Sequence, residues 1–197
     1  EAYKKGHEIG NHTFSHPSGK AFSVKEWIQE IKANTNQLRI PVMAGGVGID
    51  PEDIYGFRAP FLVYNDNLFT ALKVTNLLYD SSIEEGYQLQ IDGKNFYWPY
   101  TLDFGGKGKF LNPEWWYKEV SQPGNHPGLW EIPNYVFITP PDEVCKRYGI
   151  AIGLREKLHL KNPFFSTYYG KIPGVDFNMF FRFNMTKEEA LATLKYS

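Results

Sequence analysis

The stretch IYGFRAPFLVYNDNLFTALKVTNLLYD, residues 54–80, decides the fold class of this chain. Its first five residues, which end at Arg58, predict a short strand, and Pro60 ends that strand. Residues 65–74 predict a helix with a capping residue at its start. Residues 77–80 then predict a second strand. A strand, a helix and a second strand in this order favour an α/β architecture with a parallel sheet.

Segments on either side of this stretch extend the same pattern. Residues 7–12 predict a strand that leads into a polar loop. A helix is expected from Ser23 onward, because Ser23 and Glu26 have the spacing of a capping box. Residues 128–133 and 135–138 predict further strands, since both are short and apolar.

The rest of the chain is less regular. Residues 86–127 are rich in aromatic residues, glycine and proline and predict irregular structure. Thr186 and Glu189 form a second capping box, which predicts a terminal helix. That helix stops at Ser197 without glycine or proline, and residues 1–6 resemble the tail of a helix. We therefore expect residues 1–197 to form a single domain that is the central segment of a longer one.

Composition excludes several classes of protein. The 197 residues carry a formal net charge of −1, so there is no basic excess for binding nucleic acid. No apolar run approaches the roughly 20 residues that a membrane span requires. A single cysteine, Cys145, excludes an internal disulfide framework and a cysteine-rich zinc site. The hydrophobic fraction of 42% is enough for a globular core.

The first chemical signal is the pair His12 and His16 in the sequence HTFSH. Histidines four residues apart share one face of a helical turn, with Cβ atoms about 5–6 Å apart. That separation allows both imidazoles to bind one divalent metal, and zinc prefers such ligands. The same spacing is equally compatible with two surface histidines in a loop.

The second signal is the sequence of Arg58 to Phe61 at the end of a predicted strand. An arginine before a bend made rigid by proline can hold a carboxylate through two hydrogen bonds. His12, Arg58 and Asp80 each follow a predicted strand, so we expect all three at one edge of the sheet. An ordinary strand exit at Arg58 and an ordinary strand cap at Asp80 are the structural alternatives.

The third signal is the aromatic content, which reaches 17%. The aromatic residues concentrate around Trp98 and Tyr100, at residues 115–117 and at Trp130. Exposed aromatic faces stack on sugar rings, and Tyr and Trp add a polar group. The alternative is that most of these rings belong to the core.

In this order, the motifs resemble those of the polysaccharide deacetylases, carbohydrate esterase family four, which share the NodB-like homology domain. GHEIGNHTFSHP, residues 6–17, is similar to the family's second motif, and RAPF, residues 58–61, to its third. LYDSS, residues 78–82, lies where the fourth motif begins. WPYTLD, residues 98–103, and LWEIP, residues 129–133, are similar to stretches of the chitin-deacetylase-like branch.

The resemblance implies a distorted (β/α) barrel, here without its first and last elements, that forms a single catalytic domain. It implies an extracellular or cell-surface protein that hydrolyses N-acetyl groups of an acetylated glycan, chitin or peptidoglycan-like. His12 and His16 match the metal ligands, for zinc or else cobalt or nickel. Arg58 matches the arginine that orients the catalytic carboxylate, and the Phe61 N–H an oxyanion donor. Trp98, Tyr100 and Trp130 are the expected substrate-binding rings.

Two departures leave a second interpretation open. The family's Thr-Phe-Asp-Asp motif, with the base and the third metal ligand, and its Leu-x-His motif, with the acid, do not occur in this sequence. Ile83 replaces the second acid of the fourth motif, which leaves any catalytic role of Asp80 open. The alternative function is therefore a non-catalytic carbohydrate-binding or degenerate deacetylase-like domain. A third alternative is a structural metal loop with a substrate that is not a sugar.

Overall fold

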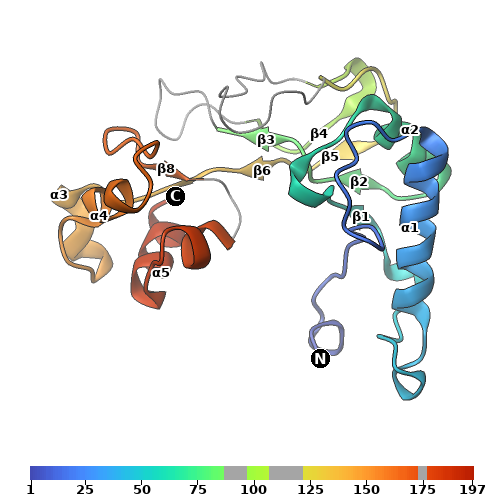
Figure 1. Ribbon diagram of the computed structural model, residues 1–197, viewed down its shortest axis with the longest axis horizontal. Coiled ribbons are helices and arrows are strands. Elements are labelled where there is room, and N and C mark those ends of the chain that lie inside the picture. Colours follow the sequence, from blue (N-terminus) through green and yellow to red (C-terminus); the bar gives the residue numbers. More distant parts are fainter. Residues whose placement is uncertain (87–96, 107–121, 173–176) are drawn as a thin grey trace. The chain divides into compact units, whose positions relative to one another are not determined.

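The computed structural model describes residues 1–86, 97–106, 122–172 and 177–197 (Figure 1). Contacts between residues divide the chain into two compact units. Unit 1 contains Glu1–Ile83 and Tyr97–Pro133, and unit 2 contains Glu84–Phe96 and Asn134–Ser197. The single domain over residues 1–197 stays a prediction.

A four-stranded sheet organises unit 1. Its strands, in spatial order, are β1 (Gly56–Phe57), β2 (Tyr79–Asp80), β5 (Trp130–Glu131) and β4 (Tyr100–Thr101). The first three strands are parallel, and β4 is antiparallel to β5. This confirms the mixed α/β class with parallel strands. The described residues do not show a barrel, which remains an expectation.

Two helices cover one face of this sheet. The helices α1 (Val24–Arg39) and α2 (Asp66–Val74) pack side by side (Figure 1). Trp27 of α1 is fully buried, and its ring lies edge-on to Phe57 of β1 with the ring centroids 6.0 Å apart. Ser23 and Glu26 form the predicted capping box at the start of α1. The buried face of α1 therefore forms part of the core of unit 1.

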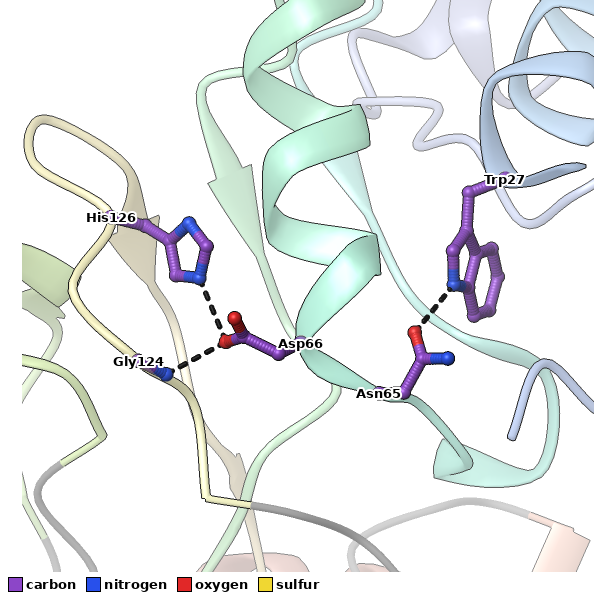
Figure 2. Close-up of polar contacts among 5 residues, drawn as sticks. All are labelled: Trp27, Asn65, Asp66, Gly124 and His126. Atoms are coloured by element: carbon purple, nitrogen blue, oxygen red, sulfur yellow. Dashed lines mark hydrogen bonds and ion pairs between the residues drawn. The ribbon is translucent and has the colours of Figure 1, made fainter. Parts of the chain in front are cut away.

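The residue before α2 differs from its predicted role. Asn65 occupies the cap position, but its side chain makes no cap hydrogen bond. Its Oδ1 accepts a hydrogen bond from Trp27 Nε1 at 2.9 Å (Figure 2). Its Nδ2 donates to the carbonyl oxygens of Lys20 and Phe22. The amide thus connects α2 to α1 and the segment that precedes it, because these partners compete with the helix end for the Asn65 side chain.

The next residue connects α2 to a distant loop. Asp66 Oδ1 accepts hydrogen bonds from His126 Nε2 at 2.8 Å and from Gly124 N at 2.7 Å (Figure 2). The ring of His126 is buried and packs on Phe69 of α2, with the ring centroids 5.4 Å apart. The start of α2 therefore holds two segments in place: residues 20–27, which come before it in the sequence, and residues 124–126, which come after it.

Three strand predictions need correction. Residues 7–12 contain no strand, and Asn11 alone pairs with Phe57 in an isolated parallel bridge, since β1 is only two residues long. Within the predicted irregular region 86–127, residues 100–101 form β4 because β5 offers an edge for pairing. The predicted strand over residues 135–138 is divided between two sheets.

Unit 2 contains two short strand pairs and three helices among its described residues. β3 (Glu84–Glu85) pairs with β6 (Asn134–Tyr135), and β7 (Phe137–Ile138) pairs with β8 (Lys171–Ile172). The helices are α3 (Asp142–Cys145), α4 (Leu154–Lys161) and α5 (Lys187–Tyr196). A π-helical segment, η7 (Asn178–Arg182), precedes α5.

The core of unit 2 lies between these helices and η7. Its buried residues include Leu158, Phe165, Met179 and Phe183. The predicted capping box of Thr186 and Glu189 begins α5. Free Cys145 is buried, as a small apolar side chain would be.

Short 3-10 helices complete the described elements. They are η1 (Tyr3–Lys5), η2 (Val42–Ala44), η3 (Pro51–Asp53), η4 (Pro60–Leu62), η5 (Leu102–Phe104) and η6 (Lys146–Tyr148). Across the described ranges, no helix has both the length and the apolar character that a membrane crossing needs.

Candidate functional site

Asn11 brings two segments of the site together. Its backbone N–H donates to Gly56 O at 2.7 Å, and its carbonyl accepts from Arg58 N at 3.1 Å. Its buried side chain donates through Nδ2 to Ile31 O and to Thr35 Oγ1. Because Asn11 lies beside Phe57 in a parallel bridge, the residues after each, His12 and Arg58, leave the sheet at the same edge.

The two histidines lie next to each other, as the spacing predicts. The ring centroids of His12 and His16 are 5.0 Å apart. His12 Nδ1 lies 2.7 Å from Arg58 O, so it carries the proton and donates it to that carbonyl. Nε2 of His12 therefore keeps a free lone pair, which is the state that a metal ligand needs.

The electrostatic surroundings favour the same state of His12. Partial desolvation lowers the pKa of the His12 imidazole, and the nearby His16 and Arg58 lower it further, although the hydrogen bond to Arg58 O opposes this. The ring is thus held in its neutral form near pH 7.

The loop between the histidines has an unusual backbone. Thr13 and His16 have φ angles of 65° and 56°, which side chains other than glycine rarely adopt. Thr13 N donates to Asn11 Oδ1, while Glu30 of α1 accepts hydrogen bonds from the backbone of Phe14 and Ser15. Such backbone strain tends to concentrate at functional sites.

A second strained loop lies against the first. Phe61 and Leu62 have φ angles of 58° and 57° within η4. The ring of Phe61 is half exposed and lies edge-on to the His16 imidazole, with the ring centroids 4.7 Å apart. The Phe61 N–H makes no hydrogen bond within the described part of the chain. It is therefore an available donor in the residue whose ring packs on His16.

Arg58 lies beside His12 in a cleft of about 510 Å³. Its Nε donates to Ser81 O and its Nη2 to Ser81 Oγ, both at 2.9 Å. Its Nη1 has no hydrogen-bond partner among the residues that the structure describes. The cleft also contains Tyr79 and Ile132, so a cationic donor faces a partly apolar wall.

Asp80 ends its strand as expected, but its side chain is not exposed. It is the last residue of β2 and is completely buried, with neighbouring Glu131 of β5 on the same face of the sheet. Asp80 thus ends its strand beside Phe57, the residue before Arg58, but its side chain is buried on the covered face of the sheet. Burial raises the pKa of the Asp80 carboxyl, despite hydrogen bonds from Glu131 and Ser82 that lower it. A catalytic role of Asp80 stays a prediction.

The acid nevertheless connects to the Arg58 segment. Asp80 Oδ1 accepts from Ser82 Oγ at 2.7 Å, and Ser82 Oγ accepts from Ala59 N at 2.8 Å. This chain of hydrogen bonds holds the backbone directly after Arg58 from the covered side of the sheet.

The predicted aromatic residues separate into exposed and buried rings. Trp98 is 79% exposed and Trp130 48% exposed, whereas Tyr100 is only 4% exposed. Trp130 shares its row of the sheet with Tyr79, and Tyr100 shares the next row with Glu131. The predicted rings at residues 115–117 lie outside the described residues. Substrate contact by Trp98, Tyr100 and Trp130 stays a prediction.

The histidine pair fits part of a metal site. The free Nε2 of His12 and the adjacent imidazole of His16 suit a divalent metal such as zinc. In the described ranges no third histidine, cysteine or carboxylate joins them to complete a cluster. The two residues therefore fit two positions of a metal's coordination sphere.

The sequence did not predict the residues that support the site residues through hydrogen bonds. Glu30, Ser81 and Ser82 were not singled out, yet each binds the backbone or the side chain of a site residue. The sequence carried little signal for them, since serine after a strand and glutamate on a helix are common at surfaces.

A comparison with protein families found a match for part of the chain. Residues 1–79 match the family model for polysaccharide deacetylase, and the matched segment contains both the His12–His16 loop and the Arg58–Phe61 loop. A comparison with curated proteins found no match for the chain. Residues 1–79 are therefore similar to the polysaccharide deacetylase family.

Proposed function

We propose that this protein hydrolyses N-acetyl groups from N-acetylglucosamine-containing polysaccharide, chitin or peptidoglycan-like, in a metal-dependent reaction that releases acetate. The observation that carries the proposal is the convergence of His12, His16 and Phe61. Two adjacent imidazoles contact the ring of a residue whose backbone N–H is unpaired in the described residues, and Arg58 lines the same cleft as His12. Amide hydrolysis needs this combination of metal ligands and an oxyanion donor.

His12 and His16 would hold the divalent metal, for which zinc is the best fit and cobalt or nickel are alternatives. A metal of this kind supplies a water of lowered pKa, towards about 7, and polarises the acetyl carbonyl. The contribution of this chain is to present His12 in the correct tautomer. The carbonyl of Arg58 does this by accepting the Nδ1 proton.

Phe61 would serve as the oxyanion donor. Its strained φ of 58° turns its ring onto His16, and its N–H has no other partner in the described residues. A positioned donor of this type contributes about 3 kcal/mol to the stabilisation of the transition state. The left-handed backbone is therefore consistent with a functional demand at this residue.

Arg58 would orient a carboxylate in the cleft. Ser81 holds one side of the guanidinium, through Nε and Nη2, which leaves Nη1 without a partner in the described residues. A planar guanidinium restrained in this way holds a carboxylate in a defined orientation. The family's base and acid motifs are not among these 197 residues, so this chain supplies only part of the catalytic set.

The glycan would bind along the exposed aromatic rings. Trp130 lies in the same row of the sheet as Tyr79 of the cleft wall, and Trp98 is the more exposed of the two tryptophans. Exposed aromatic faces can stack on sugar rings, and Trp adds a polar group. An extracellular or cell-surface location, which such a substrate requires, belongs to the same proposal.

A non-catalytic carbohydrate-binding function is the second candidate. The exposure of Trp98 and Trp130, together with the missing base and acid motifs, favours it. Under this alternative the chain binds the glycan through its rings and releases no acetate.

The test measures acetate release and glycan binding by the full-length protein, with chitin oligomers and peptidoglycan fragments as substrates. We expect zinc-dependent release that a chelator abolishes and that His12→Ala with His16→Ala reduces at least about 100-fold, the upper end for lost positioning of a metal. His7→Ala is the matched control, since the side chain of this exposed histidine has no hydrogen-bond partner in the described ranges. Chelator-insensitive release would refute the metal assignment, and binding without release would favour the second candidate.

A further inference from the structure

The loop that carries both histidines has little support of its own. Residues 13–16 contain no helix or strand, and two of them have a left-handed backbone. Such a conformation persists only when contacts from elsewhere hold it. The question is which residue of the fold supplies those contacts.

We infer that Glu30 of α1 is a positioning residue that holds His12 and His16 in the geometry for binding a divalent metal. This inference rests on the proposed function, because it concerns the same metal site. Glu30 does not approach the metal position itself, and it acts through the backbone of the loop.

Three hydrogen bonds converge on the Glu30 carboxylate. Its Oε2 accepts from Phe14 N at 2.9 Å and from Ser15 N at 2.8 Å. Its Oε1 accepts from Ser15 Oγ, also at 2.8 Å. These are the two residues at the centre of the loop, so their peptide groups cannot turn without breaking bonds to a charged acceptor.

The helix that carries Glu30 is a rigid support. Trp27 and Ile31, one turn before Glu30 and directly after it, are buried in the core of unit 1. The carbonyl of Ile31 accepts from Asn11 Nδ2. Adjacent residues of α1 therefore hold the chain on both sides of His12, since Asn11 precedes that histidine and Phe14 follows it.

A general role in fold stability is the competing explanation. It predicts that a change at Glu30 lowers the melting temperature but leaves the metal affinity of the folded protein unchanged. A positioning role predicts a weaker metal affinity in the folded protein and an altered ligand geometry.

The experiment compares Glu30→Ala, Glu30→Gln and the control Gln29→Ala in the full chain. Gln29 is exposed on the same helix turn and has no contact in the described residues. Zinc and cobalt affinities are measured by titration calorimetry. The visible absorption of bound cobalt reports the ligand geometry, and circular dichroism reports folding.

We expect Glu30→Ala to weaken metal affinity about 10- to 100-fold and to change the cobalt spectrum, because partners that orient ligands have effects of this size. Glu30→Gln keeps one oxygen that can accept from both N–H groups, so it should lose less. Gln29→Ala should match the wild type. If Glu30→Ala does not fold, a weaker affinity of Glu30→Gln than of Gln29→Ala supports the inference.

Two failures are distinguishable. If the wild type binds neither metal, or binds equally well after His12→Ala with His16→Ala, the proposed function itself fails. The second failure occurs when the wild type binds metal through its histidines but folded Glu30→Ala matches Gln29→Ala in metal affinity and cobalt spectrum. Glu30 then has no positioning role. Where Glu30→Ala does not fold, Glu30→Gln takes its place in this comparison.

Discussion

Replacing Asn11 by alanine removes the side chain that joins the histidine loop to α1. Its Nδ2 donates to Ile31 O at 2.9 Å and to Thr35 Oγ1 at 3.0 Å, and its Oδ1 accepts from Thr13 N at 3.1 Å. Asn11 is 1% exposed and Thr13 is 4% exposed. Water therefore cannot replace the lost partner of the Thr13 N–H without opening the loop.

The expected loss follows from these three contacts. A buried polar group left without a partner costs about 1–3 kcal/mol. The full cost applies to the Thr13 N–H, which is left buried without an acceptor. The half-buried Thr35 side chain can turn towards water, and Ile31 O keeps its place in the helix. We expect Asn11→Ala to lower the free energy of unfolding by about 3 kcal/mol, out of the roughly 5–15 kcal/mol of a typical domain.

Urea unfolding followed by tryptophan fluorescence measures this change, since fully buried Trp27 reports on the core of unit 1. A loss of 3 kcal/mol corresponds to a melting temperature lower by about 6–12 °C in a chain of this size. Asn36→Ala is the control, because Asn36 is exposed on α1 and its loss should change stability by no more than about 0.5 kcal/mol. A loss under about 1 kcal/mol for Asn11→Ala would refute the reasoning.

Two predictions concern pH. Burial alone would raise the pKa of Asp66, but hydrogen bonds from His126 and Gly124 outweigh it and hold the pKa below its usual value. This stabilisation is present above the unfolded pKa and is lost as pH falls below about 4. Asp66→Asn should therefore reduce the fall in the free energy of unfolding on the acid side of the pH profile. An unchanged fall on the acid side contradicts this. Burial raises the pKa of Glu85 to about 7, and 3% of the residue is exposed. The folded protein therefore holds the Glu85 proton more tightly than the unfolded chain does. The free energy of unfolding should fall by about 3 kcal/mol between pH 4.5 and 7 in the wild type but not in Glu85→Gln. The same pH dependence of the free energy of unfolding in both proteins, measured by urea titration, would contradict this.

Local sequence patterns determined much of the architecture. The capping boxes at Ser23 and Thr186 form as predicted, since each depends on residues only three positions apart. The strand–helix–strand order of residues 54–80 determined the parallel pairing of β1 and β2, because a short helical crossover leaves few other arrangements. The proximity of the His12 and His16 rings was also predicted from their spacing, but the loop between them forms no helical turn and is held by Glu30 of α1.

Tertiary structure decided which partners compete for a side chain. Asn65 has the residue type and the position of a helix cap, yet its amide binds Trp27, which is 38 residues away in the sequence. Glu30 is an ordinary helical glutamate until the fold brings residues 14 and 15 to it. No local pattern records such contacts, because they depend on how the helices pack.

The burial of Asp80 shows the same division between sequence and fold. Alternation along β2 determines that Tyr79 and Asp80 point to opposite faces of the sheet. It does not determine which face α1 and α2 cover, and that choice buries Asp80 beside Glu131 while Tyr79 lines the cleft. The sequence by itself thus determined the parallel pair β1 and β2 and the capping boxes of α1 and α5, which depend on neighbours along the chain. The tertiary structure decided the faces and the hydrogen-bond partners, because these depend on residues that meet only after the helices pack on the sheet.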